Sequence, residues 1–367
     1  MTNSPATVIK PRPAIADPAL SRPDWTAVAR KPEATLRLDK NENTDPEFRE
    51  LVASVFREVS ADAAMDYPEI APVYRQLAEH VGLDARNLLI AAGSDGAIRA
   101  VFETFISPGD TVVHTSPTFA MYPVYTAMFG ARAAPVAYEC RNGVPTLLAD
   151  TLCAHIRAAR PRLVCLPNAD SPTGTEFSLE EIRDIVTAAR DVGAVILIDE
   201  AYYPFSTVTA MPLIDGFENL IVTRTFAKAW GLAGARIGYL AAQPALAEML
   251  HKVRPMYEVN GVALAMLVAM IPLADRVERS VARIKEGKVA FARRMRALDL
   301  QVFECAGNFL HVDFGDARDA VHAALHGRVL YRENFSEPCL AGFSRFTGAP
   351  AEVMDELSDM ISTALAK

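Results

Sequence analysis

The chain has 367 residues, of which 51% are hydrophobic and 22% charged, and its formal net charge is −8. This length fits one large domain plus a smaller one, and the composition is that of a globular protein, not of a disordered chain. The acidic balance argues against a nucleic-acid binder, so any anion site depends on a local cluster of arginines.

The sequence has no predicted membrane span or signal peptide and no cysteine or histidine pattern typical of disulfides or metal sites. No run of about eighteen apolar residues predicts a membrane span, and the N-terminus lacks the basic start and apolar core of a signal peptide. The five cysteines are scattered and the seven histidines show no metal-ligand spacing. We therefore expect a cytoplasmic protein with free thiols, no membrane contact and no metal site.

Residues 1–36 carry prolines at positions 5, 11, 13, 18, 23 and 32 and predict an irregular N-terminal arm. Such arms are either disordered or pinned across a neighbouring subunit, and Trp25 favours the second arrangement.

Residues 66–255 alternate short apolar runs with amphipathic stretches, which predicts a large α/β domain with a mostly parallel sheet covered by helices on both faces. Helices are expected over 96–106 and 178–191, the second with a capping box from Ser178 to Glu181. Buried strands are expected at 88–91, 111–114, 163–166, 194–198 and 220–222.

Residues 37–65 and 256–367 are assigned to a smaller α+β domain. A long helix over about 259–297, broken near Pro272, leads into strands near 300–303, 309–312 and 328–331.

Lys228 is the most informative residue. It follows the apolar run 220–222 and precedes Arg236 by eight positions, a setting unlike that of a solvated surface charge. Burial lowers the pKa of a lysine, and a neutral amine can condense with a carbonyl. With Arg236 holding an anionic group, the pattern indicates a Schiff base to pyridoxal phosphate.

The other candidates also follow predicted strands, where ligands bind in parallel sheets. The turn from Gly93 to Gly96 opens a helix whose N–H groups suit a phosphate, although an ordinary turn explains it equally well when taken alone. Asp199 ends a buried strand and would be stabilised by a pyridinium nitrogen, with a helix cap as the alternative. Tyr202 could donate to the ring oxygen.

Three further features are weaker. Phe119 could stack on a flat ring, although it and Tyr122 also fit an ordinary core. The turn 167–174 offers hydrogen bonds but has the composition of any loop. Arg332 and Arg345, thirteen positions apart, could together bind a carboxylate or phosphate.

Together, residues 38–367 resemble the class I/II aminotransferases of pyridoxal-phosphate fold type I, with the histidinol-phosphate aminotransferases as the nearest group. The resemblance lies in the order and spacing of several short stretches. They are Asn41-Glu42-Asn43, Asp66-Tyr67-Pro68-Glu69, Gly93-Ser94-Asp95, 117–122, Ser171-Pro172-Thr173-Gly174, 199–202, 225–228 with Arg236, Gly307-Asn308-Phe309, and Arg332 with Arg345.

This resemblance implies a role for each matched residue. Lys228 would bind the cofactor covalently and move the proton, Asp199 would pair with the ring nitrogen, and Tyr202 would bond the ring oxygen. Tyr67 would reach the neighbouring subunit's cofactor, which implies a homodimer with shared sites. Ser94, Asp95, Thr225 and Arg236 would hold the phosphate, Phe119 would stack on the ring, and Arg345, Arg332 and Asn308 would bind substrate.

The chain departs from the family pattern at four places. Ser171 stands where asparagine is usual, Ala227 replaces a common phosphate-binding serine, and Gly96 stands where glutamate is frequent. The Asn41-Glu42-Asn43 stretch also lacks its usual following proline.

The resemblance thus implies an aminotransferase for an anionic amine or amino acid, such as histidinol phosphate, and a 2-oxo acid such as 2-oxoglutarate, with ping-pong kinetics. One alternative is a pyridoxal-phosphate-dependent decarboxylase of an O-phospho amino acid, similar to threonine-phosphate decarboxylase. Another is a non-catalytic cofactor-binding regulator, which the short N-terminal arm disfavours because it has no room for a DNA-binding module.

Overall fold

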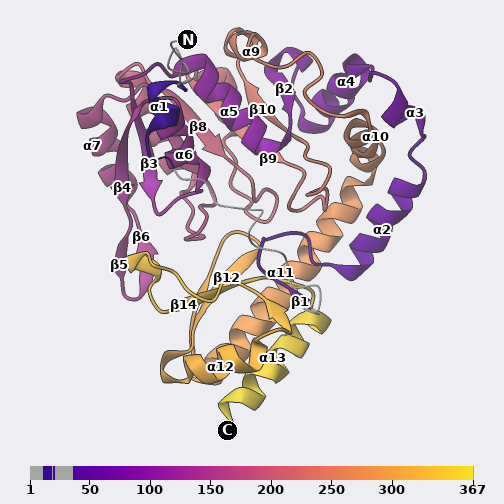
Figure 1. Cartoon of the computed structure of the whole chain (residues 1–367), viewed down its shortest axis with the longest axis vertical. Coiled ribbons are helices and arrows are strands. Elements are labelled where there is room, and N and C mark those ends of the chain that lie inside the picture. The colour runs from indigo at the N-terminus through magenta and orange to yellow at the C-terminus, as the bar shows by residue number, and fades with distance from the viewer. Residues whose placement is uncertain (1–10, 19, 21–35, 367) are drawn as a thin grey trace, which may run out of the picture.

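The computed structural model describes residues 11–18, 20 and 36–366. They form a large part built on a seven-stranded sheet and a smaller part built on a three-stranded sheet (Figure 1). No helix in these ranges is long and apolar enough to cross a membrane. Most of the predicted N-terminal arm, including Trp25, lies outside the described residues; within it, α1 (Pro13–Ala16) follows Arg12, which donates to the Met128 carbonyl at 3.1 Å.

The large sheet has the strand order β2-β10-β9-β8-β7-β3-β4. Neighbouring strands from β9 to β4 run parallel, and only β10 is antiparallel to both of its neighbours. All five predicted strands are confirmed. Their bounds are β2 Leu88–Ala91, β3 Thr111–Ser116, β7 Leu163–Pro167, β8 Val195–Asp199 and β9 Leu220–Thr225, and the two strands without a prediction are β4 Arg132–Ala137 and β10 Gly238–Ala242.

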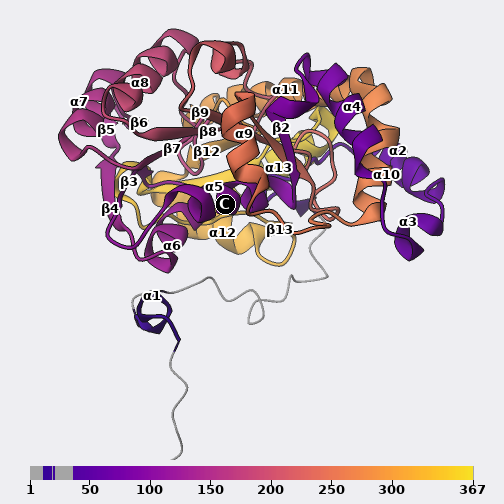
Figure 2. The ribbon, with the colours of Figure 1, turned by 90° about the horizontal axis from the view of Figure 1, so that it is seen from above.

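Helices cover both faces of this sheet, as predicted (Figure 2). Val164 and Leu166 of β7 belong to the core under α7 (Ala149–Ala159) and α8 (Leu179–Asp191). Leu163 and Cys165 belong to the opposite core, under α5 (Gly93–Phe105), α6 (Met121–Met128) and α9 (Pro244–His251). Because successive strand residues point to opposite faces, covering both faces requires an unbroken apolar strand.

The predicted long helix is broken where Pro272 falls. It forms α10 (Gly261–Met270), a 3-10 turn (Ile271–Leu273) and α11 (Ala274–Arg296). The small sheet is antiparallel, in the order β11 (Gln301–Glu304), β12 (Phe309–Asp313), β14 (Phe343–Thr347), and packs with α12 (Arg318–Leu325) and α13 (Ala351–Leu365).

Residues 36–57 contact both parts of the molecule. β1 (Leu36–Arg37) pairs with β13 (Val329–Leu330), so the strand predicted at 328–331 forms outside the three-stranded sheet. In α2 (Pro46–Arg57), however, Phe48 packs in the core that contains Ile196 of β8. The division at residue 65 therefore stays a prediction. The remaining elements are α3 (Asp62–Met65), α4 (Ile70–Val81), β5 (Glu139–Arg141) and β6 (Val144–Thr146).

Candidate active site

Most of the predicted cofactor residues follow β2, β7, β8 and β9 where these strands end. These four strands point the same way, because β10 is antiparallel to both β2 and β9. Their carboxyl ends therefore meet at one edge of the sheet, which is where open α/β sheets bind ligands.

The amine of Lys228 sits between the large and small parts. Its Nζ donates to the carbonyl of Lys40 at 2.7 Å and lies 5.9 Å from the centre of the Tyr202 ring. Burial lowers the pKa of Lys228 to about 8, and the positive charges of Arg345 and Arg236 add to the effect. A substantial share of the amine is therefore neutral near pH 8 and able to attack a carbonyl.

Asp199 is a buried carboxylate whose hydrogen-bond partners carry no positive charge. Only 4% of the residue is exposed. Tyr122 Oη donates to Oδ2 at 3.0 Å and Thr223 Oγ1 donates to Oδ1 at 3.2 Å. Burial raises the pKa of Asp199 to about 6 in spite of these donors. A cation brought in by a ligand would stabilise the charged form.

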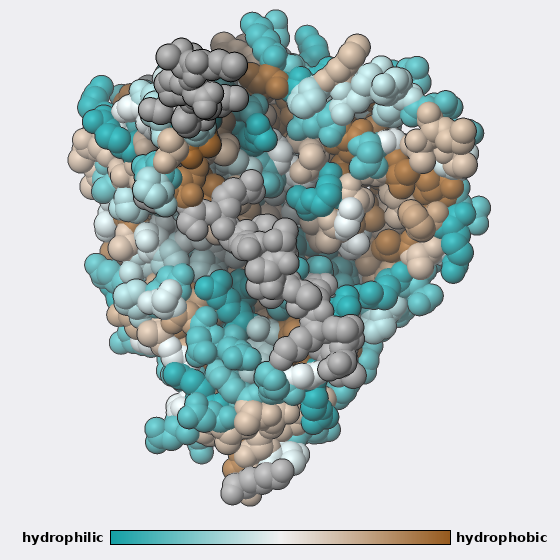
Figure 3. Space-filling model, viewed as in Figure 1, coloured by the Kyte–Doolittle hydropathy of each residue, from teal (hydrophilic) through white to brown (hydrophobic). Residues whose placement is uncertain are grey.

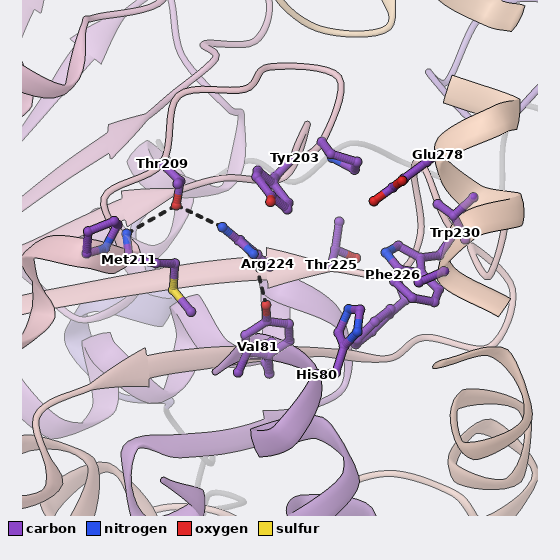
Figure 4. A pocket seen from close by; sticks show the side chains of 15 residues that line it. His80, Val81, Tyr203, Thr209, Met211, Arg224, Thr225, Phe226, Trp230 and Glu278 are labelled. Carbon is purple, nitrogen blue, oxygen red and sulfur yellow. Dashed lines mark hydrogen bonds between the residues drawn. The ribbon is translucent and has the colours of Figure 1, made fainter. Parts of the chain in front are cut away.

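The neighbouring Glu200 has the cation that Asp199 lacks. Arg224 Nη2 lies 2.9 Å from Glu200 Oε2, and the Arg224 guanidinium also bonds Thr209 and stacks on Tyr203 (Figure 4). Arg224, Thr209 and Tyr203 border a cavity of about 380 Å³, which Thr225 also lines but Lys228 and Asp199 do not. Arg224 is thus committed to Glu200.

Tyr202, predicted to bond the ring oxygen, lies beside Ser171, which stands where the family usually has asparagine. Tyr202 is 5% exposed, and its hydroxyl accepts from Asn41 Nδ2 at 2.9 Å and is hydrogen-bonded to the Ser171 side chain. Because Asn41 donates to the Tyr202 oxygen, this bond leaves the Tyr202 proton able to donate to another oxygen. Burial raises the pKa of Tyr202, so the hydroxyl stays protonated.

The turn at the start of α5 has the features of an anion-binding site. Gly93 has a φ of 77°, and a Cβ at this position would lie 2.8 Å from Arg236 Nη2. The glycine thus lets an exposed arginine approach a helix N-terminus, where backbone N–H groups attract anions. Ser94 and Asp95 lie in this first turn, and Tyr125 Oη donates to Asp95 Oδ1 at 3.0 Å.

Two other predicted cofactor residues lie at strand ends. Thr225 ends β9, and its hydroxyl accepts from the Ala227 N–H at 3.1 Å. Phe119 is half-buried, with its ring centre 5.7 Å from that of Tyr122.

Arg345 and Arg332 are directly opposite each other, since their backbones exchange hydrogen bonds of 3.1 and 2.8 Å. Arg345 is only 9% exposed, and its Nη2 donates to the Asp39 carbonyl at 3.0 Å while its Nε has no hydrogen-bond partner among the described residues. Burial and the charge of Arg332 both lower the pKa of Arg345. A buried, incompletely bonded guanidinium favours binding of a carboxylate.

The side chains of Arg332 and Asn308 already make contacts within the chain. The Arg332 guanidinium lies 4.3 Å from the centre of the Phe335 ring and 4.0 Å from Glu337. Asn308 donates to the carbonyls of Asn41 and Glu42 at 3.1 and 3.2 Å. Its buried Oδ1 has no partner in the described part of the chain.

Tyr67 lies outside the contacts that join the other residues. It is 79% exposed, stacks on Tyr257 with ring centres 4.4 Å apart, and borders a surface cavity with Met65 and Asn260.

The arrangement fits a phosphorylated pyridine aldehyde. Lys228 matches the aldehyde, Asp199 the ring nitrogen, and the α5 N-terminus with Arg236 the phosphate. The fold and these groups define a fold type I enzyme that uses pyridoxal 5'-phosphate. The chain belongs to the family of class I and II aminotransferases, whose model matches residues 34–361, and it is a transaminase.

Known proteins that are similar to this chain in sequence or structure include members of this family. A histidinol-phosphate aminotransferase of Burkholderia lata is 34% identical over 329 residues, which cover 86% of this chain and 89% of that protein. The histidinol-phosphate aminotransferase of Sinorhizobium meliloti, solved with pyridoxal-5'-phosphate, superposes with a TM-score of 0.78 at 23% identity over 91% of each chain. The L-threonine-O-3-phosphate decarboxylase of Porphyromonas gingivalis gives 0.75 at 19% identity, over 90% of this chain and all of that one.

Sequence reasoning gave no role to several residues that the structure connects to the site. Tyr122 was read as core, and its contact with Asp199 crosses 77 positions of sequence. Thr223 is a mid-strand residue with no motif, and Asn41 appeared only as part of a matched stretch.

Proposed function

We propose that this transaminase moves an amino group from an anionic amine resembling histidinol phosphate to a 2-oxo acid such as 2-oxoglutarate, by a ping-pong mechanism. The single observation that carries the proposal is Arg345, a buried guanidinium whose Nε has no hydrogen-bond partner among the described residues and whose charge acts on Lys228. Arg332, paired with it through the backbone, supplies a second positive charge for a substrate anion. The Burkholderia lata relative named above supports the choice of donor.

The chain's own residues would divide the chemistry as follows. Pyridoxal phosphate, when bound, supplies a carbonyl for Lys228 and an electron-withdrawing ring. Asp199 would hold the ring nitrogen charged, Tyr202 with Ser171 would bond the ring oxygen, and Phe119 would cover the ring face. Lys228, with its pKa lowered to about 8, would take a proton from the substrate Cα and deliver it to the cofactor.

Anion binding would be shared between two regions. Ser94 and Asp95 main-chain groups, Thr225 and Arg236 would hold the cofactor phosphate. Arg345, Arg332 and Asn308, whose Oδ1 has no partner within the described ranges, would orient substrate.

The proposal includes a homodimer in which Tyr67 reaches the partner's cofactor. Large apolar side chains are exposed beside Tyr67 and its stacking partner Tyr257 in sequence, namely Met65 at 80% and Met256 at 78%, and Phe56 of α2 is 59% exposed. A groove bordered by Phe48, Phe56 and Met266 continues this surface, and Figure 3 shows apolar residues gathered where α2 and α10 lie. A second copy of the chain would cover it. The proposal also includes a cytoplasmic location, supported by five free cysteines.

A half-reaction screen tests the function. Single amines are added to the cofactor-loaded enzyme, and conversion of the bound aldehyde form to the amine form is followed by absorbance. Histidinol phosphate should convert it, and 2-oxoglutarate should then restore the aldehyde form. Carbon dioxide release without restoration by any 2-oxo acid would support the decarboxylase instead.

A further inference from the structure

The segment from Leu38 to Asn43, here called the linking segment, joins β1 to α2 and runs between the large and small parts (Figure 1). Thr347 of the small part donates its N–H to the Leu38 carbonyl at 2.9 Å. Asn43 Nδ2 donates to the Ala229 carbonyl of the large part, also at 2.9 Å. The segment is therefore bonded to both sides of the active site.

Two successive carbonyls of this segment accept hydrogen bonds from two different site residues. The Asp39 carbonyl accepts from Arg345 Nη2 at 3.0 Å, and the next carbonyl, of Lys40, accepts from Lys228 Nζ at 2.7 Å. The proposed carboxylate arginine and the lysine are thus held through adjacent peptide units.

Asn41 follows these carbonyls and is itself fully bonded. It is 2% exposed and has a φ of 54°, in the left-handed region that asparagine tolerates and branched residues avoid. Its N–H donates to Thr347 Oγ1 at 3.0 Å, and the same hydroxyl donates back to Asn41 Oδ1 at 3.2 Å. Its remaining amide group, Nδ2, donates to Tyr202 Oη at 2.9 Å.

We propose that Asn41 is a positioning residue with two separable roles. Its left-handed backbone directs the preceding carbonyls to Arg345 and Lys228, and its side-chain amide polarises the Tyr202 hydroxyl toward the cofactor. The inference rests on the proposed function, because it takes Arg345 as the carboxylate residue and Tyr202 as the donor to the ring oxygen.

Each role predicts a different effect. A hydroxyl that accepts a hydrogen bond becomes a better donor, so the Asn41 amide strengthens the bond from Tyr202 to an anionic ring oxygen. Without it, the midpoint of the pH titration of the bound cofactor's absorbance should rise by roughly 0.3 of a pH unit. Loss of the left-handed turn should instead weaken carboxylate binding.

Two variants separate the roles. Asn41→Gly keeps the left-handed conformation and removes the amide, so it should raise the titration midpoint. Asn41→Val cannot adopt this φ without strain, so it should raise the KM for the 2-oxo acid roughly tenfold more than Asn41→Gly does. Thermal melting checks that both variants fold. If Asn41→Val does not fold, the titration midpoint of Asn41→Gly still tests the role of the amide.

A double-mutant cycle with Tyr202→Phe completes the test. If the amide acts through Tyr202, Asn41→Gly should shift the midpoint in the parent enzyme and leave it unshifted when the Tyr202 hydroxyl is absent. Equal shifts in both backgrounds, or equal KM increases for Gly and Val, would overturn the inference. A parent enzyme that transfers no amino group would overturn the proposed function, whereas these outcomes in an active parent would overturn only the role of Asn41.

Discussion

Asp199 and Glu200 are adjacent in sequence, and both are buried, but their carboxylates have different surroundings. Glu200 has Arg224 at 2.9 Å, whereas Asp199 receives hydrogen bonds from the hydroxyls of Tyr122 and Thr223. A buried charge without a counter-ion destabilises the fold, and such residues concentrate at functional sites. Asp199 therefore lowers stability until a ligand provides a cation.

This imbalance gives a pH prediction for the enzyme freed of cofactor. The pKa of Asp199 is raised to about 6 in the folded state, from an ordinary value of 3.8. The stability that its protonated form contributes is complete below about pH 4 and is lost as the pH rises through 6. Asp199→Asn should thus raise the free energy of unfolding by up to about 3 kcal/mol at pH 7 and change it little at pH 4.

Melting of the cofactor-free protein across pH 4–8 measures this effect. Asp215→Asn, which alters an exposed aspartate, is the control and should leave the pH dependence unchanged. Equal melting of parent and Asp199→Asn at every pH would contradict the role given to burial. The loaded variant should also transfer amino groups far more slowly than the parent.

Lys228 leads to a second prediction at this scale. Lys228→Ala should abolish covalent attachment of the cofactor, read as the mass of the protein after borohydride reduction. It should also slow turnover by about a thousandfold or more, because proton transfer is lost with the amine. Lys252→Ala, at an exposed lysine, is the matched control; near-normal turnover of Lys228→Ala would refute the assignment.

At the scale of elements, apolar runs predicted strands well and polar or small-residue strands poorly. The five predicted strands were predictable because each contains consecutive apolar residues, from Val112 and Val113 in β3 to the four residues 195–198 in β8. β4 escaped prediction because it is an edge strand with mostly exposed residues and a proline, Pro135. β10 escaped because it is short and has Gly238 at its start and two alanines at its end, although its position next to β9 buries it completely.

The helix start at Ser178 was predictable because its chemistry is local. The structure confirms the capping box, in which the Ser178 hydroxyl accepts from the Glu181 N–H at 3.3 Å and the Ser178 N–H donates to Glu181 Oε2 at 2.8 Å. The contact of Tyr122 with Asp199 was not predictable in the same way, because tertiary packing brings these residues together from distant positions.

Removal of this cap should cost stability without affecting chemistry. Ser178→Ala loses the hydroxyl that accepts from Glu181, so the free energy of unfolding should fall by about 1 kcal/mol. Denaturant titration measures the change, and Ser107→Ala, at an exposed serine outside any cap, should lie within about 0.5 kcal/mol of the parent. A loss for Ser107→Ala as large as that for Ser178→Ala would remove the argument for the cap.

At the scale of the whole molecule, the site is assembled from segments far apart in the chain. The linking segment, the strand ends of the large part and Arg345 of the small part meet around Lys228. Spacing and resemblance predicted most of these members, because each follows a recognisable strand or turn. The hydrogen bonds that connect them, such as those of Asn41, depend on how the two parts pack. They could not be predicted from local sequence patterns.

The exposed Tyr67 allows the proposed sharing of sites between subunits to be tested. If each site uses its own Lys228 and the partner's Tyr67, the variants Tyr67→Ala and Lys228→Ala should each be strongly impaired. Mixed subunits should nevertheless form one intact site per heterodimer, with up to about a quarter of the parent activity in an equal mixture. Arg236→Ala mixed with Lys228→Ala is the control, and it should restore nothing because Arg236 and Lys228 serve the same site in one chain. Heterodimers of the first pair that form and remain inactive would mean that Tyr67 does not act across the interface.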